Sequence, residues 1–250
     1  MEIVVLGSGT AIPDPERGSP GIAVEVEGSL LFLDLGSGSL TRASRAGLSV
    51  EQTCGVLLSH LHPDHAADLV PLLFAFRNPE YRRTRELLLV GPAGISEYWE
   101  SLRRVYGDWL ATPGYSCRVL SVVESDLRFG SWRLRTCAVP HGPPAVAYEI
   151  TGADGRRLVY SGDTDESDAL AAFAAGADLL ILECSFPEGQ KRPGHLTPSG
   201  AGRIAAKAGC RQLLLTHFYP ACRGFDLATP CREFYHGPIT LAADGLRVRF

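Results

Sequence analysis

The 250-residue chain is 45% apolar and carries a formal charge of −4 at pH 7. Its length and composition suit one large α/β domain with a sizeable core, and because no linker is evident we expect one domain over residues 1–250. The negative charge excludes a global field that attracts polyanions, so nucleic-acid binding would need a local basic patch. Residues 1–6 begin a strand without a basic leader or a long apolar segment, which predicts a cytosolic protein with no membrane contact.

The seven cysteines are odd in number, scattered, and never spaced as Cys-x-x-Cys. This pattern indicates neither a disulfide framework nor a thiolate zinc site. Cys222 and Cys231, with His236 nearby, are the one pair considered as a redox or accessory metal site.

The first predicted strand, residues 2–6, ends in Gly7-Ser8-Gly9-Thr10. A dinucleotide fingerprint is excluded because Ile12 stands where its third glycine belongs, so a tight turn is expected. Residues 21–26 and 30–33 predict a hairpin around Gly28 and Ser29, and its second strand ends in Asp34. That carboxylate either caps the next helix or orients a metal-binding histidine.

The most informative stretch is residues 59–65, which follow the apolar run 54–58. That run predicts a buried strand, so the polar residues lie at its carboxyl end. Alternate residues of an extended chain point the same way, which lets His60 and His62 converge on one point, as zinc ligands do. After the turn at Pro63, Asp64 and His65 can serve a neighbouring point, and the spacing predicts two adjacent metal ions.

The segment from His60 to His65 resembles the His-x-His-x-Asp-His signature of the metallo-β-lactamase superfamily. The order of the flanking motifs is most similar to the ribonuclease Z branch and its phosphodiesterase and arylsulfatase relatives, over nearly the whole chain. The resemblance also favours the orienting role for Asp34. The opening of that branch, Leu-Gly-x-Gly-x-x-x-Pro, is matched by Leu6, Gly7, Gly9 and Pro13.

The middle of the chain bears on substrate choice. Residues 66–76 are expected to be helical, the basic residues 81–85 are expected to be solvated, and an amphipathic helix should end near Tyr106. Trp99, Tyr106 and Trp109 are expected to pack a core face rather than line a pocket. The long Gly/Pro-rich arm with which bacterial ribonuclease Z enzymes grip transfer RNA has no counterpart here.

Residues 117–160 again alternate as strands, and His141 follows one of them. In superfamily order this is the next metal ligand. Asp163 closes the strand before Thr164, and the resemblance implies that its carboxylate is shared by both metals. Asp165 is not expected to be a ligand.

The last third supplies three more site residues. Glu183 and His195 resemble the Glu-Ala-Thr and His-x-Thr motifs of ribonuclease Z, with Ser185 in place of threonine. Thr197 is expected to cap a helix over residues 198–208. His217 ends a buried strand, and the family's Ser-Pro-Arg-Tyr is here replaced by residues 218–221.

These observations predict a four-layer αββα metallo-β-lactamase sandwich. One zinc is expected on His60, His62 and His141, a second on Asp64, His65 and His217, and Asp163 is expected to bridge them; manganese or iron are alternatives. The predicted catalytic residues are Asp64, His195 as general acid, and Glu183, which keeps His195 charged.

The resulting hypothesis is a dinuclear zinc phosphodiesterase that uses a metal-activated hydroxide, with RNA 3′-processing as its candidate activity. An arylsulfatase or lactonase on the same metals is an alternative, because the ligand set does not fix the substrate. A metal-stabilised RNA-binding or interaction module is the non-enzymatic alternative. The resemblance further implies a homodimer.

Overall fold

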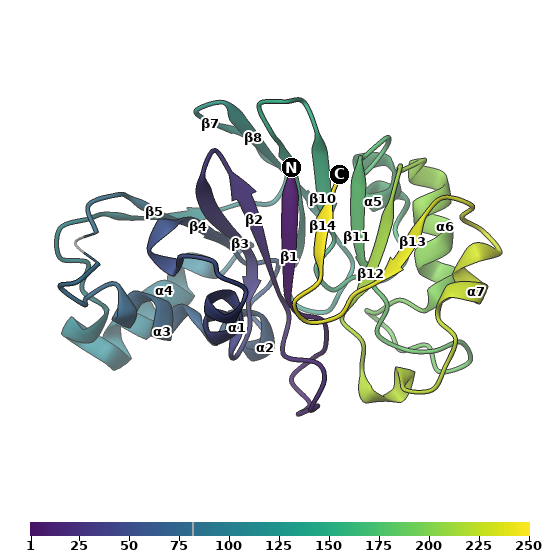
Figure 1. The fold of residues 1–250 in the computed structure, drawn as a ribbon, viewed down its shortest axis with the longest axis horizontal. Coiled ribbons are helices and arrows are strands. Elements are labelled where there is room, and N and C mark those ends of the chain that lie inside the picture. Colours follow the sequence, from purple (N-terminus) through teal and green to yellow (C-terminus); the bar gives the residue numbers. More distant parts are fainter. Residues whose placement is uncertain (82) are drawn as a thin grey trace.

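The computed structural model describes residues 1–81 and 83–250. Two seven-stranded sheets lie between two groups of helices, with α1–α4 on the left and α5–α7 on the right in Figure 1. The predicted αββα sandwich is therefore confirmed. No helix in the described part of the chain is both long enough and apolar enough to cross a membrane.

The first sheet has the order β14-β1-β2-β3-β4-β5-β6, and β3 to β6 run parallel. Its hairpin turns at Glu27 and Gly28, both with positive φ, as a two-residue turn with the twist of the strands requires. The strands are β1 (Glu2–Gly7), β2 (Gly21–Val26), β3 (Ser29–Leu35), β4 (Thr53–Leu57), β5 (Leu87–Gly91), β6 (Cys117–Ser121) and β14 (Arg247–Arg249).

The second sheet has the order β13-β12-β11-β10-β9-β8-β7, and β10 to β13 run parallel. Because β8 and β10 are both antiparallel to β9, β8 also ends at the edge where β10, β11 and β12 end. The strands are β7 (Asp126–Phe129), β8 (Trp132–Ala138), β9 (Val146–Thr151), β10 (Arg157–Tyr160), β11 (Leu179–Glu183), β12 (Leu213–Thr216) and β13 (Ile239–Leu241).

The helices cover the outer faces of the sheets. Three connections between helices and strands contain a short 3₁₀ segment: η1 (Val50–Gln52), η2 (Gly107–Leu110) and η3 (Pro220–Cys222). The α-helices are α1 (Ser39–Arg45), α2 (Pro63–Ala66), α3 (Leu69–Ala75), α4 (Ile95–Tyr106), α5 (Asp168–Phe173), α6 (Pro198–Ala208) and α7 (Ala228–Arg232).

Strand β1 shows why the apolar runs are continuous. Ile3 and Val5 belong to the hydrophobic core shared by the two sheets, whereas Val4 and Leu6 belong to the core beneath α1–α4. Because successive side chains point to opposite faces, a strand buried on both faces needs apolar residues at every position. Residues 8–20 join β1 to β2 as a loop rather than as the expected tight turn, and glycine is needed at position 7 because a Cβ there would lie 1.8 Å from the carbonyl oxygen of Ser19.

Three more local predictions need correction. Thr197 occupies the cap position of α6 but its side chain makes no capping hydrogen bond; instead the Glu188 carboxylate accepts from the Ser199 amide at 2.7 Å. Of the three aromatics expected to pack a core face, Trp99 is buried, but Tyr106 and Trp109 are 40% and 62% exposed.

The basic segment is the third correction. Arg83 is buried rather than solvated, because it packs over the rings of Phe76 and Tyr115 and donates to the carbonyls of Glu51 and Glu86. Arg82, which belongs to the same predicted basic segment, lies outside the described residues.

Candidate metal centre

The first group of donors gathers at the carboxyl ends of β4, β8 and β10. Nε2 of His60 lies 2.9 Å from Nδ1 of His62, and Nε2 of His141 lies 3.5 Å from the same Nδ1. Oδ2 of Asp163 is 3.9 Å from Nε2 of both His60 and His141. These four residues therefore converge as the sequence predicts.

The second group comprises Asp64, His65 and His217. Nε2 of His65 and Nε2 of His217 are 3.3 Å apart, and Oδ2 of Asp64 lies 3.9 Å from each. Oδ1 of Asp163 lies 3.4 Å from His65 and 3.3 Å from His217. Asp163 thus turns one oxygen toward each group, as a bridging carboxylate would.

The hydrogen bonds of the imidazoles test whether these residues suit metal ions. Nδ1 of His65 donates to Asp34 at 2.7 Å and Nδ1 of His141 donates to the Gly194 carbonyl at 2.9 Å. Nδ1 of His60 and of His217 face serine hydroxyl groups that themselves donate to carboxylates. Since each of these four rings donates through Nδ1, its Nε2 lone pair is left facing the others.

Facing lone pairs repel one another unless a cation lies between them. Oδ1 of Asp163 is buried and makes no hydrogen bond within the described residues. Nitrogen and carboxylate donors in this arrangement are the set that zinc and similar divalent ions take, so the residues fit metal ions.

Asp34 holds the second group in place. Its carboxylate accepts hydrogen bonds from the Ser59 amide (2.7 Å), the Ser59 hydroxyl (2.8 Å) and the Tyr160 hydroxyl (2.6 Å), besides that from His65. The helix-capping alternative for Asp34 is excluded, because Gly38 occupies the cap position of α1 and the amide of Leu40 in the first turn donates to Asp68 instead. Partners of this kind fix the tautomer and orientation of a metal-binding imidazole.

Backbone strain concentrates at the same place. Among the described residues, Asp34 and His217 are two of the three non-glycine residues with positive φ, at 55° and 61°. Such conformations are costly and persist where the surroundings enforce them, which is common at functional sites. Gly162 also has positive φ, and a Cβ there would lie 2.3 Å from Cβ of Ser59, so only glycine lets the loops of His60 and Asp163 meet.

Burial and neighbouring charges shift the pKa values of the predicted metal ligands His60, His65 and Asp64. Burial, and then the neighbouring imidazoles, hold the pKa of His60 far below its usual value, so it stays neutral as a ligand must. Burial also disfavours charge on His65, but the carboxylates of Asp163, Asp34 and Asp64 outweigh it and raise its pKa to about 9. A metal ion bound by Nε2 of His65 would therefore displace a proton. Burial raises the pKa of Asp64, but the neighbouring imidazoles of His217 and His65 together outweigh burial and lower that pKa overall.

His195 and Glu183 lie beside this centre. Nδ1 of His195 is 3.0 Å from Oε1 of Glu183 and 3.8 Å from Oδ2 of Asp163. Burial lowers the pKa of His195, but the hydrogen bond with Glu183 and its charge outweigh burial and raise that pKa overall. Glu183 is itself fixed by the amides of Thr164 (2.8 Å) and Leu196 (3.1 Å).

Two carboxylates with supporting contacts were not anticipated from the sequence. Asp165 is no member of the donor groups, as expected, but it accepts from the Gly194 amide at 2.9 Å and from Nζ of Lys191 at 2.7 Å, and so holds the loop that carries His195. Asp244 accepts from the amides of Ser8 (2.9 Å) and Gly18 (2.8 Å) and so closes the loop between β1 and β2.

The closed loop reaches the metal centre through Ala11, whose amide donates to Oδ2 of Asp64 at 3.1 Å. Each of these contacts joins residues far apart in the chain. Motif spacing therefore carried no signal for either carboxylate.

The cysteine pair does not behave as a second site. Burial raises the pKa of Cys222 to about 11 and that of Cys231 to about 12, so both are thiols rather than thiolates at neutral pH. His236 is exposed, and none of the three residues joins a donor group in the part of the chain that the structure describes.

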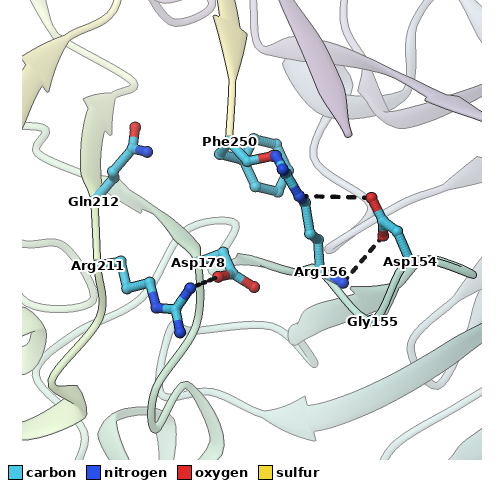
Figure 2. Close-up of a pocket in the computed structure, with 7 residues that line it drawn as sticks. All are labelled: Asp154, Gly155, Arg156, Asp178, Arg211, Gln212 and Phe250. Carbon is cyan, nitrogen blue, oxygen red and sulfur yellow. Dashed lines mark hydrogen bonds and ion pairs between the residues drawn. The ribbon is translucent and has the colours of Figure 1, made fainter.

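A cavity of about 450 Å³, away from these donors, is drawn in Figure 2. Its charged groups neutralise one another, since Arg211 pairs with Asp178 at 2.9 Å and Arg156 with Asp154 at 3.6 Å. It contains none of the predicted site residues, and its paired charges offer no free group for chemistry.

Comparisons with known proteins agree with this geometry. A ribonuclease Z of Ignicoccus hospitalis is 30% identical over 266 residues, which cover 86% of this chain and 87% of that protein. An uncharacterised protein of Mycobacterium leprae is 32% identical over 252 residues, and the match covers 98% of this chain and 87% of that protein. The metallo-β-lactamase fold protein YhfI from Bacillus subtilis superposes with a TM-score of 0.84 at 26% identity, covering 99% of this chain and 98% of that one.

The family described as the beta-lactamase superfamily domain matches residues 33–218, a span that includes every predicted metal ligand. The predicted resemblance and the prediction of an enzyme with this fold are thus confirmed. The chain belongs to the metallo-β-lactamase-fold branch of the beta-lactamase superfamily.

Proposed function

We propose that residues 1–250 form one hydrolase domain that cleaves phosphodiesters with two divalent cations, zinc first. The observation that carries this proposal is the placement of Asp163, with one oxygen 3.9 Å from His60 and His141 and the other within 3.4 Å of His65 and His217. Two separate donor groups that share one carboxylate suit a pair of ions better than a single one.

In this proposal His60, His62 and His141 hold one ion, and Asp64, His65 and His217 hold the other. Such a pair of ions supplies a water of lowered pKa and stabilises negative charge on the substrate oxygens. The chain contributes fixed imidazole orientations through Asp34, Ser59, Ser185 and the Gly194 carbonyl.

His195 is the proposed general acid. Glu183 accepts a hydrogen bond from Nδ1 of His195 and favours its protonated form, so Nε2 carries the proton that a departing oxygen would take. Asp64 is proposed as catalytic because, as a ligand of the second ion, its carboxylate would help to hold the ion that lowers the pKa of a bound water.

RNA is the proposed substrate class, supported by the ribonuclease Z relative at 30% identity. The replacement of the family's Ser-Pro-Arg-Tyr by residues 218–221 makes a direct test necessary. A homodimer is part of the proposal on resemblance alone, and sedimentation velocity tests it. A cytosolic location is proposed as well, and cell fractionation tests it.

The deciding experiment is substrate profiling on purified protein whose metal content has been measured by elemental analysis. The panel contains bis(p-nitrophenyl) phosphate, p-nitrophenyl sulfate, a lactone and precursor transfer RNA. Turnover of the phosphodiesters, abolished in the His60→Ala variant, is the expected result. Preferential turnover of the sulfate or the lactone would replace the proposal by the corresponding hydrolase, and bound metal without any turnover would support a binding module.

A further inference from the structure

Two aromatic side chains beside the metal centre have no part in the proposed chemistry. Phe186 follows β11 and Tyr219 follows β12, and their rings stack with centroids 4.6 Å apart and an interplanar angle of 20°. The backbone fixes the pair, because the Tyr219 amide donates to the Ser185 carbonyl and the Phe186 amide to the Leu196 carbonyl, both at 3.3 Å.

The pair does not serve the hydrophobic core. Both residues are half-buried, and neither belongs to the two apolar cores or to the partly buried side chains packed against them. The neighbouring Phe218 is, by contrast, 3% exposed and lies in the core. Two rings held together outside the core, with surface left open to solvent, are available to a ligand.

The position of the pair says which part of a substrate it meets. The ring of His195 lies 5.7 Å from that of Phe186 and 5.8 Å from that of Tyr219, and Tyr219 also lies 5.8 Å from His217. A general acid must come within about 3 Å of the oxygen that it protonates. The group attached to that oxygen therefore lies within reach of the two rings.

We propose that Phe186 and Tyr219 form the leaving-group subsite and select phosphodiesters whose departing group carries a flat aromatic ring, an aryl group or a nucleobase. The inference rests on the proposed function. Stacking of a base on aromatic side chains contributes about 1–3 kcal/mol and tolerates any planar ring, so the subsite selects ring shape rather than base identity.

A matched pair of ligands tests the subsite. Phenyl methylphosphonate and cyclohexyl methylphosphonate carry the same charge and nearly the same size, and differ in whether the ring is flat. Calorimetry on the metal-loaded protein should show about tenfold tighter binding of the phenyl ester. The double variant Phe186→Leu/Tyr219→Leu should bind both esters about equally, while Trp109→Leu, an exposed aromatic on η2, should keep the preference.

The outcomes separate the two proposals. Turnover of bis(p-nitrophenyl) phosphate together with equal binding of the two esters by the natural protein contradicts the subsite alone. A preference that survives in the double variant, with unchanged metal content and circular dichroism, also contradicts it. Absence of phosphodiester turnover in the natural protein contradicts the proposed function itself.

Discussion

The carboxylate of Asp34 lies 2.7 Å from Nδ1 of His65, and both side chains are fully buried. Since Asp34 also accepts three other hydrogen bonds, from Ser59 and Tyr160, it cannot turn away from the imidazole. The orientation of His65 is therefore set by a residue at the end of the neighbouring parallel strand.

Replacing Asp34 by asparagine should weaken one of the two metal sites. An amide cannot accept every hydrogen bond that the carboxylate accepts, so His65 loses its fixed tautomer and the second ion should bind about 10–100-fold more weakly. Zinc titration of the chelated protein measures this. Asp178→Asn is the matched control, because that carboxylate contacts Arg157 and Arg211 and no ligand; equal affinities in both variants would contradict the role of Asp34.

The Glu183–His195 pair predicts a pH dependence. The pKa of His195 is raised above its ordinary value, so the proton-donating form persists below that raised pKa and is lost as the pH rises through it. Turnover should fall along this alkaline limb, and Glu183→Gln should move the limb to lower pH because the stabilising charge is gone.

The His195→Ala variant completes this test. It should lose the alkaline limb and cut turnover by about 10²–10⁴, with metal content nearly unchanged. An alkaline limb at the same pH in all three proteins would remove His195 from the mechanism.

Asp244 predicts an effect at a distance. Asp244→Asn should release the loop of residues 8–18, so that hydrogen exchange of the Ser8 and Gly18 amides accelerates and the contact of Ala11 with Asp64 weakens. Zinc affinity should drop at the Asp64 group and remain unchanged at the His60 group. Asp154→Asn, at the cavity of Figure 2, should alter neither quantity.

The buried guanidinium of Arg83 predicts a stability difference within one basic segment. Arg83→Ala should lower the free energy of unfolding by about 1–3 kcal/mol, because two carbonyls lose their donor and two rings lose a packed cation. Arg85→Ala, at an exposed position, should change it by less than about 0.5 kcal/mol. Urea titration of the two variants compares them, and equal values would contradict a structural role for Arg83.

The donor residues could be predicted because each follows a short apolar strand. Parallel strands of one sheet end at a common edge, so Asp163 and His217 had to come close once β10 and β12 were identified. His60 follows β4 of the other sheet, and its place beside them was implied by the family resemblance. Asp34 was predictable for the same reason, although only the structure excludes its alternative role as a helix cap.

What escaped prediction depends on contacts between distant segments. The basic segment indicated solvent exposure, yet Arg83 is buried because Phe76 and Tyr115 supply its surroundings. Glu188 takes the capping bond expected of Thr197 because a loop outside the helix brings the stronger acceptor to the Ser199 amide. The local sequence pattern specifies which helices and strands form, whereas these contacts depend on which loops the fold brings together.

The donors come from both sheets, with residues 60–65 following β4 of the first and His141, Asp163 and His217 following strands of the second. A pair of ions held here would fasten together two halves that are otherwise joined by their apolar faces. Separating the halves, and so exposing them to a protease, would then also require the loss of the bound ions. Metal supply would then govern how long each molecule survives in the cell, and starvation for metal would deplete the protein as well as silence it.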